Sequence, residues 1–175
     1  MTKPGPQCIT VHTRSPDETE RLGALIASLL PRGAVVALRG ELASGKTCFV
    51  RGMAAAVSES GGPGRVHSPT FTLVNEYGQS PRLYHMDLYR LGGADELADL
   101  GYEELFDSDG ICAVEWAERA EPLLPAARLD ILLEHEPPTD ADSVQSRRVT
   151  LCDNGLLPNG WRGRVADLTD AAPAP

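Results

Sequence analysis

Long apolar runs are missing from this chain of 175 residues, and no stretch reaches the roughly 18 residues that a membrane-spanning helix needs. The segment from Met1 to Pro6 also lacks the apolar core of a signal peptide. We therefore expect a cytoplasmic protein with no membrane partner. The length, with 42% hydrophobic and 23% charged residues, is typical of one ordinary globular domain.

Positive charge is scarce, and the formal net charge is −9. Such a balance excludes a protein that binds nucleic acid strongly through its phosphates. The acidity is concentrated between Asp95 and Glu121, where ten carboxylates accompany a single base, Arg119. This stretch has two interpretations: a solvated surface that aids solubility, or a docking face for a basic partner.

Cysteine is also scarce and scattered. Cys8, Cys48, Cys112 and Cys152 lie far apart, they form no C-x-x-C pair, and the four histidines do not cluster with them. The pattern indicates neither a zinc site nor a disulfide framework. It predicts four free thiols in a reducing compartment.

Lysine is nearly absent, because the chain has fourteen arginines and only Lys3 and Lys46. Lys46 lies in the segment GELASGKT, from Gly40 to Thr47, which fits G-x-x-x-x-G-K-[ST] without a mismatch. An apolar run precedes this segment and a helix-compatible run follows it, which is the strand–loop–helix context of a phosphate-binding loop. An accidental match is disfavoured because the one internal lysine stands where a compact point charge is needed.

A phosphate-binding loop works through convergent backbone N–H groups and the positive end of the following helix. We expect Lys46 to reach the β and γ phosphates and Thr47 to offer its hydroxyl to Mg²⁺. The guanine-reading N-K-x-D box is impossible here, since neither lysine follows an asparagine, so ATP or ADP is the expected nucleotide. The other expected nucleotide contacts are Glu41, Leu42, Ala43, Ser44, Gly45 and Cys48.

Two acids, Asp87 and Glu115, each close an apolar strand, and Mg²⁺ needs carboxylate oxygens beside the hydroxyl of Thr47. We assign Asp87 to the metal and Glu115 to the orientation of the attacking water, with Glu115 also a possible ligand of Mg²⁺. Thr70, in Ser68-Pro69-Thr70, is a further candidate for contact with Mg²⁺ or the γ-phosphate. Trp116 is either a core aromatic or a stacking group near the nucleotide, and His85 is interpreted as a satisfied core histidine.

The order of expected elements predicts an α/β protein with a central mixed sheet. A helix is expected to start at Ser15-Pro16, because the serine and Glu18 form a capping box. The run from Phe71 to Tyr77 and the strand ending at Asp87 are predicted to pair as an antiparallel hairpin. One domain is expected over residues 1–152, and residues 153–175 are predicted to form a loose tail. The remaining strands are expected at 9–12, 34–38, 110–114, 129–133 and 147–151, and helical segments at 47–57, 94–107 (interrupted at Gly101) and 117–124.

Four motifs together resemble the TsaE (YjeE) family of small bacterial ATPases required for threonylcarbamoyladenosine on tRNA. They are the phosphate-binding loop, Ser68-Pro69-Thr70-Phe71-Thr72, Tyr84-His85-Met86-Asp87-Leu88-Tyr89-Arg90 and Glu115-Trp116-Ala117-Glu118. The resemblance implies a three-layer P-loop NTPase-like fold, Mg-ATP binding and slow hydrolysis. It further implies functional roles for Lys46, Thr47, Thr70, Asp87, Glu115 and Trp116, and a complex with TsaD and TsaB type proteins.

The chain departs from the family pattern in its loop. Ala43 stands where the family usually has glycine, and Cys48 where a second threonine is common. Alanine disfavours a left-handed backbone at that position. Two other functions share such a loop: a small-molecule kinase, whose lid arginines would be Arg65 and Arg82, and a nucleotide-sensing adaptor with incidental hydrolysis.

Overall fold

The structure is a computed structural model that describes residues 5–58, 66–69, 72–137 and 145–170, with the backbone alone at residues 102 and 103. Its strands form one sheet in the order β1-β7-β6-β2-β5-β4-β3. The four central strands, β6, β2, β5 and β4, are parallel to one another. The three outer pairings are antiparallel: β1 with β7, β7 with β6, and β3 with β4. The predicted mixed sheet and the predicted hairpin are therefore confirmed. The strands are β1 (Gln7–Thr13), β2 (Val35–Arg39), β3 (Val74–Tyr77), β4 (Leu83–Asp87), β5 (Ile111–Glu115), β6 (Leu129–His135) and β7 (Arg147–Asp153).

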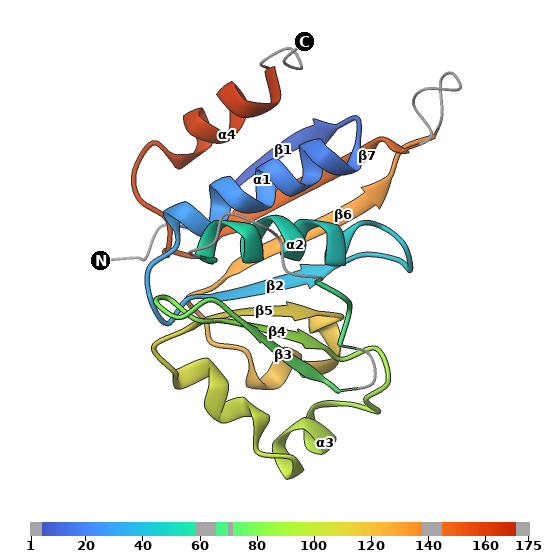
Figure 1. The fold of residues 1–175 in the computed structure, drawn as a ribbon, viewed down its shortest axis with the longest axis vertical. Helices are drawn as coiled ribbons and strands as arrows, with labels where there is room; N and C mark the ends of the chain where they lie inside the picture. Colours follow the sequence, from blue (N-terminus) through green and yellow to red (C-terminus); the bar gives the residue numbers. More distant parts are fainter. Residues whose placement is uncertain (1–4, 59–65, 70–71, 138–144, 171–175) are drawn as a thin grey trace.

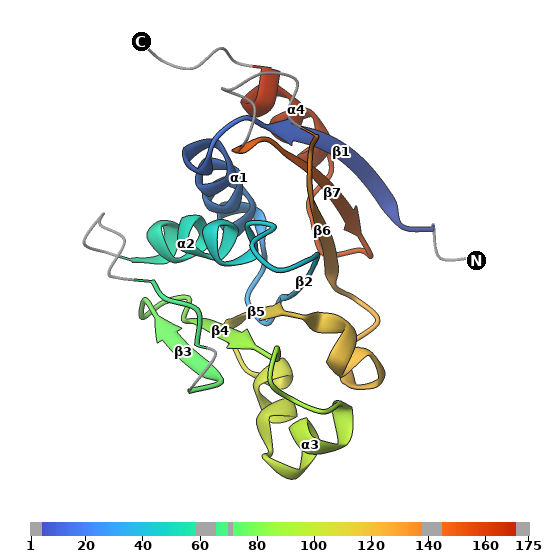
Figure 2. The same cartoon turned by 90° about the vertical axis from the view of Figure 1, so that its right-hand side faces the viewer.

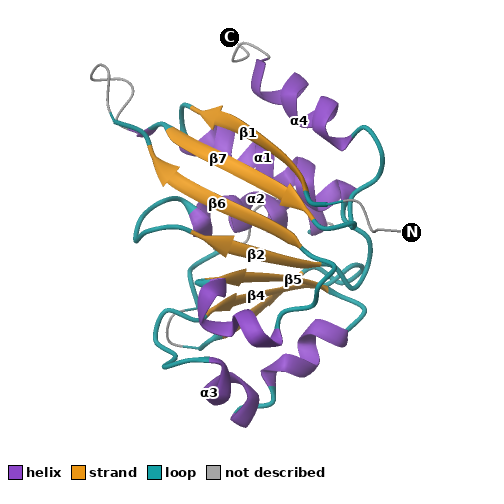
Figure 3. Ribbon diagram, turned by 180° about the vertical axis from the view of Figure 1, so that it is seen from behind, coloured by secondary structure: helices purple, strands orange, loops and turns teal. Residues whose placement is uncertain are grey.

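Helices cover both faces of the sheet centre, which is why the central strands are apolar throughout. Helices α1 (Pro16–Leu29) and α2 (Lys46–Val57) lie side by side on one face (Figure 1). The other face carries α3 (Ala94–Asp99) and the short 3-10 segments η1 (Tyr102–Asp107) and η2 (Ala117–Leu123), visible from behind in Figure 3. All five residues of β5 are buried, as its position between two helical layers requires. The three-layer P-loop-like arrangement is thus confirmed at the centre of the sheet.

In the part of the chain that the structure describes, the β1 side of the sheet has two layers. On β6 and β7 buried and more accessible residues alternate, with period two, because one face meets the core and the other meets solvent. The polar face carries cross-strand pairs, such as Thr10 with Thr150 at 3.0 Å and Arg148 with Glu134 at 3.1 Å. Sheet packing therefore explains why these strands are less apolar than β2 and β5.

Helix α1 begins as its sequence predicts. The Ser15 side chain accepts a hydrogen bond from the backbone N–H of Glu18 at 3.2 Å, and Pro16 occupies the first helical turn. The Glu18 carboxylate in turn accepts from the backbone N–H of Arg14 at 2.7 Å. Helix α2 then packs very closely on α1, since a Cβ at Gly52 would lie 1.8 Å from the carbonyl oxygen of Glu20. This close contact holds α2, and with it the preceding loop, in a defined place.

The prediction of four free thiols is wrong for two of them. Cys8 on β1 and Cys152 on β7 stand opposite each other in the antiparallel register and form a disulfide, with Cα atoms 4.1 Å apart. They are separated by 144 residues, so no local spacing could reveal the pair. Cys48 and Cys112 remain free, and burial raises the pKa of Cys112 to about 12. Strand register, which the sequence pattern does not specify, decides this pairing.

A loose tail was predicted over residues 153–175, and this is wrong for residues 161–170. Residues Trp161–Asp170 form helix α4, which packs on α1 and β1 at the opposite end of the molecule from α3 (Figure 2). Trp161 and Val165 belong to the same buried cluster as Leu22 and Ile26 of α1. Residues 171–175 lie outside the described residues. Among the helices of the described ranges, none is long and apolar enough to cross a membrane.

Replacing Trp161 by alanine is expected to lower the free energy of unfolding by about 3–5 kcal/mol. The indole is only 2% exposed, so its removal leaves a cavity between α4 and α1. Denaturant titration measures the effect, with Arg162→Ala as the matched control, because Arg162 is the exposed neighbour in the same helix. Equal stabilities of the two variants would show that α4 is not docked.

Candidate functional site

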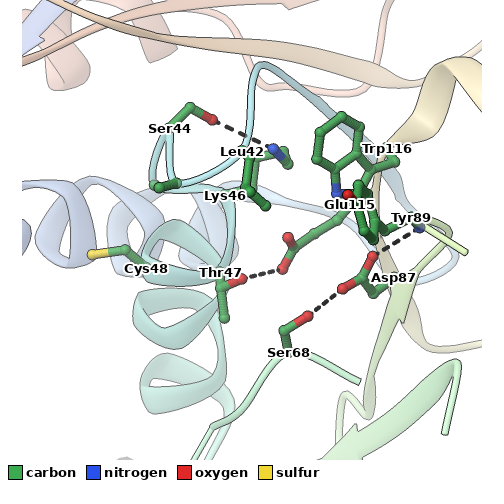
Figure 4. A pocket seen from close by; sticks show the side chains of 12 residues that line it. Leu42, Ser44, Lys46, Thr47, Cys48, Ser68, Asp87, Tyr89, Glu115 and Trp116 are labelled. Carbon is green, nitrogen blue, oxygen red and sulfur yellow. Dashed lines mark hydrogen bonds between the residues drawn. The ribbon is translucent and has the colours of Figure 1, made fainter. Parts of the chain in front are cut away.

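The site lies where parallel strands end. Strands β2, β4 and β5 run in the same direction, so their carboxyl ends meet at one edge of the sheet, the usual position of ligand sites in open α/β sheets. Asp87 is the register partner of Glu115 across the β4–β5 pair. A cavity of about 330 Å³ opens at this edge (Figure 4), and it is lined by Leu42, Ala43, Ser44, Gly45, Lys46, Thr47, Cys48, Ser68, Asp87, Tyr89, Glu115 and Trp116.

The loop between β2 and α2 needs its glycines. Gly40 has φ 135°, and a Cβ there would lie 2.2 Å from the carbonyl oxygen of Leu133. Gly45 caps α2 with a left-handed φ of 106°. A side chain at either position would strain the loop. The glycine positions of the motif therefore correspond to real steric requirements of the turn into α2.

Ala43 adopts the left-handed conformation that disfavours a side chain, with φ 61°. A residue with a Cβ loses about 1–2 kcal/mol in this region. The backbone at Ala43 is therefore left-handed, the conformation for which alanine is poorly suited. The loop keeps its shape although the residue is unfavourable, which requires support from elsewhere in the fold.

Arg147, the first residue of β7, supplies such support. Its Nε donates to the carbonyl oxygen of Ser44 at 3.0 Å, and its Nη2 donates to that of Ala43 at 3.5 Å. These bonds hold the two carbonyls toward Arg147, on the outer side of the loop. Sequence reasoning missed Arg147, because it follows the loop by about a hundred positions and belongs to no motif.

Lys46 is folded back into its own loop. Its Nζ donates to the carbonyl oxygens of Gly40 at 2.7 Å and Glu41 at 2.8 Å, and lies 4.0 Å from the centre of the Trp116 ring. Burial lowers the pKa of Lys46, an effect opposed by the negative charges of Glu115, Glu118 and Asp87. An anionic ligand in the cavity would favour the charged ammonium further.

Glu115 is 3% exposed and makes two contacts through a single oxygen. Its Oε1 accepts a hydrogen bond from Thr47 Oγ1 at 2.8 Å and lies 2.7 Å from His85 Nε2. Figure 4 shows the carboxylate pointing from the end of β5 toward the start of α2. The strand-end acid Glu115 and the loop threonine Thr47 are therefore brought together in one hydrogen bond.

Asp87, also 3% exposed, is fixed through both oxygens. Tyr89 donates its backbone N–H to Oδ1 at 2.9 Å, and the hydroxyl of Ser68 donates to Oδ2. In the described part of the chain no cluster of three or more His, Cys, Asp or Glu side chains could hold a metal by itself. A cation at this edge would need the Thr47 hydroxyl, one or both acids, and oxygens of a ligand or of water, which is the coordination that Mg²⁺ accepts.

Trp116 lines the cavity and also packs against the buried core on the α3 side of the sheet. It is half-buried, has a left-handed φ of 58°, and its ring lies 5.0 Å from that of Tyr89 between centroids. The Trp116 ring lies over the ammonium of Lys46, and both rings line the cavity (Figure 4). Of the two roles left open by the sequence, the core contact is observed, and the ring also stands beside the cavity, while stacking on a nucleotide stays a prediction. Tyr89 was not predicted, although it lies in the same segment as Asp87.

Three further predicted residues are Thr70, Glu41 and Cys48. Thr70 lies outside the described residues. Glu41 contributes its carbonyl to Lys46 but its side chain does not line the cavity. Cys48 lines the rim, but its sulfur points away from the acids toward the carbonyl oxygen of Pro16 at 3.3 Å (Figure 4), and burial raises its pKa to about 11.

Replacing Ala43 by glycine is expected to raise the free energy of unfolding by about 0.5–1 kcal/mol. Relief of the left-handed strain exceeds the added entropy of the unfolded chain, which is about 0.4–1 kcal/mol. The matched control is Ala55→Gly within α2, the same chemical change in a helix, where we expect a loss of about 1 kcal/mol. Chemical denaturation of both variants measures the sign, and a destabilising Ala43→Gly would contradict the strain argument.

Three kinds of comparison point to one family. The family model of Threonylcarbamoyl adenosine biosynthesis protein TsaE matches residues 13–146. The tRNA threonylcarbamoyladenosine biosynthesis protein TsaE of Bacillus subtilis is 40% identical over 147 residues, covering 81% of this chain and 89% of the relative. The protein of the same name from Treponema pallidum is 42% identical over 121 residues, covering 69% and 87%, and that from Streptomyces coelicolor is 38% identical over 152 residues, covering 85% and 95%.

The crystal structure of YdiB from Bacillus subtilis has the same fold. It superposes with a TM-score of 0.68 at 30% sequence identity, covering 93% of this chain and 95% of the other. The region matched by the family model contains the loop with Lys46 and Thr47, both strand-end acids and Trp116. On these sequence and structural matches, this chain belongs to the TsaE family.

Proposed function

We propose that this protein is a Mg²⁺-dependent ATPase that serves threonylcarbamoyladenosine (t6A) formation on tRNA, acting on a complex of the TsaB–TsaD type. The relatives carry t6A biosynthesis in their names, and this supports the pathway. The observation that best supports ATP hydrolysis is the hydrogen bond between Thr47 of the phosphate-binding loop and Glu115 at the end of β5. Asp87, at the end of β4, stands beside Glu115 as its register partner.

The residues present suit Mg-ATP. The N-terminus of α2 and the loop amides offer donors for a polyphosphate, and Lys46 offers a point charge next to them. The Thr47 hydroxyl and the carboxylates of Asp87 and Glu115 are the hard oxygen donors that Mg²⁺ prefers. When bound, the metal would neutralise the phosphate oxygens as charge develops on them.

The two acids divide the work in this proposal. Asp87, fixed by Ser68 and by the backbone of Tyr89, is placed to serve the metal directly or through water. Glu115 orients the attacking water and accepts its proton. Since Glu115 and not Asp87 contacts Thr47, Glu115 also lies close enough to the metal position to contribute an oxygen there.

A small-molecule kinase gains no support from the arginines that would form its lid. Arg82 stands at the start of β4, at the opposite end of the strand from Asp87, and pairs with Glu76 at 2.8 Å. Arg65 lies outside the described residues. The ATPase is therefore the function that the geometry supports best.

The experiment that tests the function compares ATP hydrolysis by the purified protein alone and with TsaB and TsaD type proteins. We expect feeble hydrolysis alone and a clear increase with the partners, because the isolated site keeps Lys46 engaged by its own loop. Phosphate release measured with and without Mg²⁺ gives the metal requirement. Hydrolysis unaffected by the partners, or a phosphorylated metabolite from an ATP-metabolite mixture, would contradict the proposal.

The docking face in this proposal is the acidic side of α3 and η1, where Asp95, Glu96, Asp99 and Glu104 are exposed. We expect Asp99→Lys combined with Glu104→Lys to weaken partner binding in pull-down or calorimetric titration while leaving ATP binding unchanged. Asp167→Lys is the control, since Asp167 is an exposed acid of α4 at the other end of the molecule. Equal loss in the control would indicate a general charge effect instead of a docking face.

A further inference from the structure

His85 is a buried polar residue that the proposed chemistry does not yet use. It is 0% exposed and stands on β4 two residues before Asp87, so the two side chains share one face of the strand. Its Nε2 lies 2.7 Å from Oε1 of Glu115 on the neighbouring strand β5. The interpretation of His85 as a satisfied core histidine is therefore only half right: the residue is buried, but it contacts a functional acid.

The contact with Glu115 determines which ring nitrogen of His85 carries the proton. An ionised carboxylate can only accept hydrogen bonds, so the proton in this contact belongs to Nε2 of His85. The other ring nitrogen, Nδ1, is buried and has no hydrogen-bond partner among the described residues. A buried nitrogen without a partner costs about 1–3 kcal/mol, whereas an apolar side chain of similar size would avoid that cost. Packing alone does not account for a histidine at this position.

The bond to His85 differs from the bond to Thr47 in what happens when nucleotide binds. Thr47 belongs to the phosphate-binding loop, and in the proposed function its hydroxyl would be a ligand of Mg²⁺ and would no longer donate to Glu115. His85 belongs to strand β4, in the sheet and outside the phosphate-binding loop. His85 would then be the donor that still holds Oε1, and Oε2, which has no hydrogen bond to the described residues, would face the attacking water.

From this arrangement we infer that His85 is a positioning residue, which holds the Glu115 carboxylate in its orientation for hydrolysis by donating Nε2–H to Oε1. The inference rests on the proposed ATPase function for its reaction. Its geometric part, the proton on Nε2 and the bond to Glu115, does not depend on activity. Removing a polar partner that orients a metal-ligating group through one hydrogen bond typically lowers activity or metal affinity by about 10–100-fold.

The kinetic test uses two variants of His85. His85→Leu removes the donor and is expected to lower kcat by about 10–100-fold, with the ATP dissociation constant changed less than about twofold. His85→Gln places an amide N–H near the former Nε2 and is expected to recover part of kcat. Met86→Leu, a volume-conserving change of the adjacent buried residue, is the control for core disturbance, and all rates are referred to the folded fraction from thermal melts.

A double-mutant cycle separates positioning from a structural effect. In the Glu115→Gln background, His85→Leu is expected to cause little further loss, because the group that it positions no longer acts. Full kcat in His85→Leu, or a loss that simply adds to that of Glu115→Gln, would overturn the inference. If instead the wild-type protein does not hydrolyse ATP even with its partners, the proposed function fails, and the state of His85 is judged by spectroscopy.

The second readout is independent of catalysis. In the nucleotide-free protein, nitrogen-15 chemical shifts of the His85 ring at neutral pH are expected to show a protonated Nε2. A ring protonated on Nδ1 alone would leave no proton for the bond to Glu115, and would overturn the inference whether or not the protein hydrolyses ATP. In the Glu115→Ala variant the Nε2 resonance is expected to shift, since its acceptor is gone.

Discussion

Lys46→Ala is expected to abolish the binding of Mg-ATP and Mg-ADP. Lys46 is 4% exposed, its ammonium lies among the carbonyl oxygens of the loop, and Trp116 covers it at 4.0 Å. A polyphosphate in the adjacent cavity would have no other cation from the loop to neutralise it. Isothermal calorimetry measures the loss, and circular dichroism checks that the variant remains folded.

Lys46→Arg is the informative companion, and we expect it not to restore binding. A guanidinium is a planar fork, which does not fit where a compact ammonium reaches the carbonyl oxygens of Gly40 and Glu41 at 2.7 and 2.8 Å. Substitution of the exposed Arg162 by alanine is a suitable control for loss of one positive charge. Unchanged ATP affinity in Lys46→Ala would remove the phosphate-binding role of this loop.

Glu115→Gln is expected to slow ATP hydrolysis about 10²-fold or more while nucleotide binding stays nearly intact. The amide oxygen of glutamine can still accept from Thr47 and His85, so the local hydrogen bonds at 2.8 and 2.7 Å survive. What is lost is the negative charge that orients water and takes its proton. Single-turnover phosphate release and equilibrium binding measure the two effects separately.

Asp87→Asn provides the contrast, because we expect it to weaken Mg²⁺-dependent binding. Both oxygens of Asp87 accept hydrogen bonds, from Ser68 and from the backbone of Tyr89, so an amide would meet a donor on one side. Titration of ATP with and without Mg²⁺ detects the change. The opposite pattern in the two variants would exchange the roles of the acids, and full activity in both would exclude them from the site.

Local features of the site could be predicted well from the sequence. The phosphate-binding loop and the start of α1 depend on neighbouring residues, namely the glycines, the Ser15 cap and Pro16, and the structure has both where the pattern places them. Asp87 and Glu115 were found because each closes an apolar strand; that the two strands run parallel and so end at one edge of the sheet was seen only in the structure. The unfavourable left-handed backbone at Ala43 was anticipated through the family resemblance, because the family usually has glycine at that position.

Contacts between distant segments could not be predicted in the same way. Arg147 on the loop carbonyls, His85 on Glu115 and Cys8 with Cys152 each depend on the strand order or on the register of two strands. Hydrophobic periodicity indicates which face of a strand is buried but not which strand lies beside it. The same limit explains why α4 was taken for a loose tail, since its segment is mostly polar and is held by Trp161 and Val165 packing on α1.

The sequence by itself thus determined the phosphate-binding loop, the two strand-end acids and the mixed α/β class, because each is encoded by residues that are neighbours in the chain or that repeat with a fixed period. Only the tertiary structure decided how these groups are held: Lys46 under Trp116, Glu115 between Thr47 and His85, and the loop against Arg147. The physical reason is that side-chain hydrogen bonds act over about 3 Å, so their partners are set by the packing of whole strands and helices.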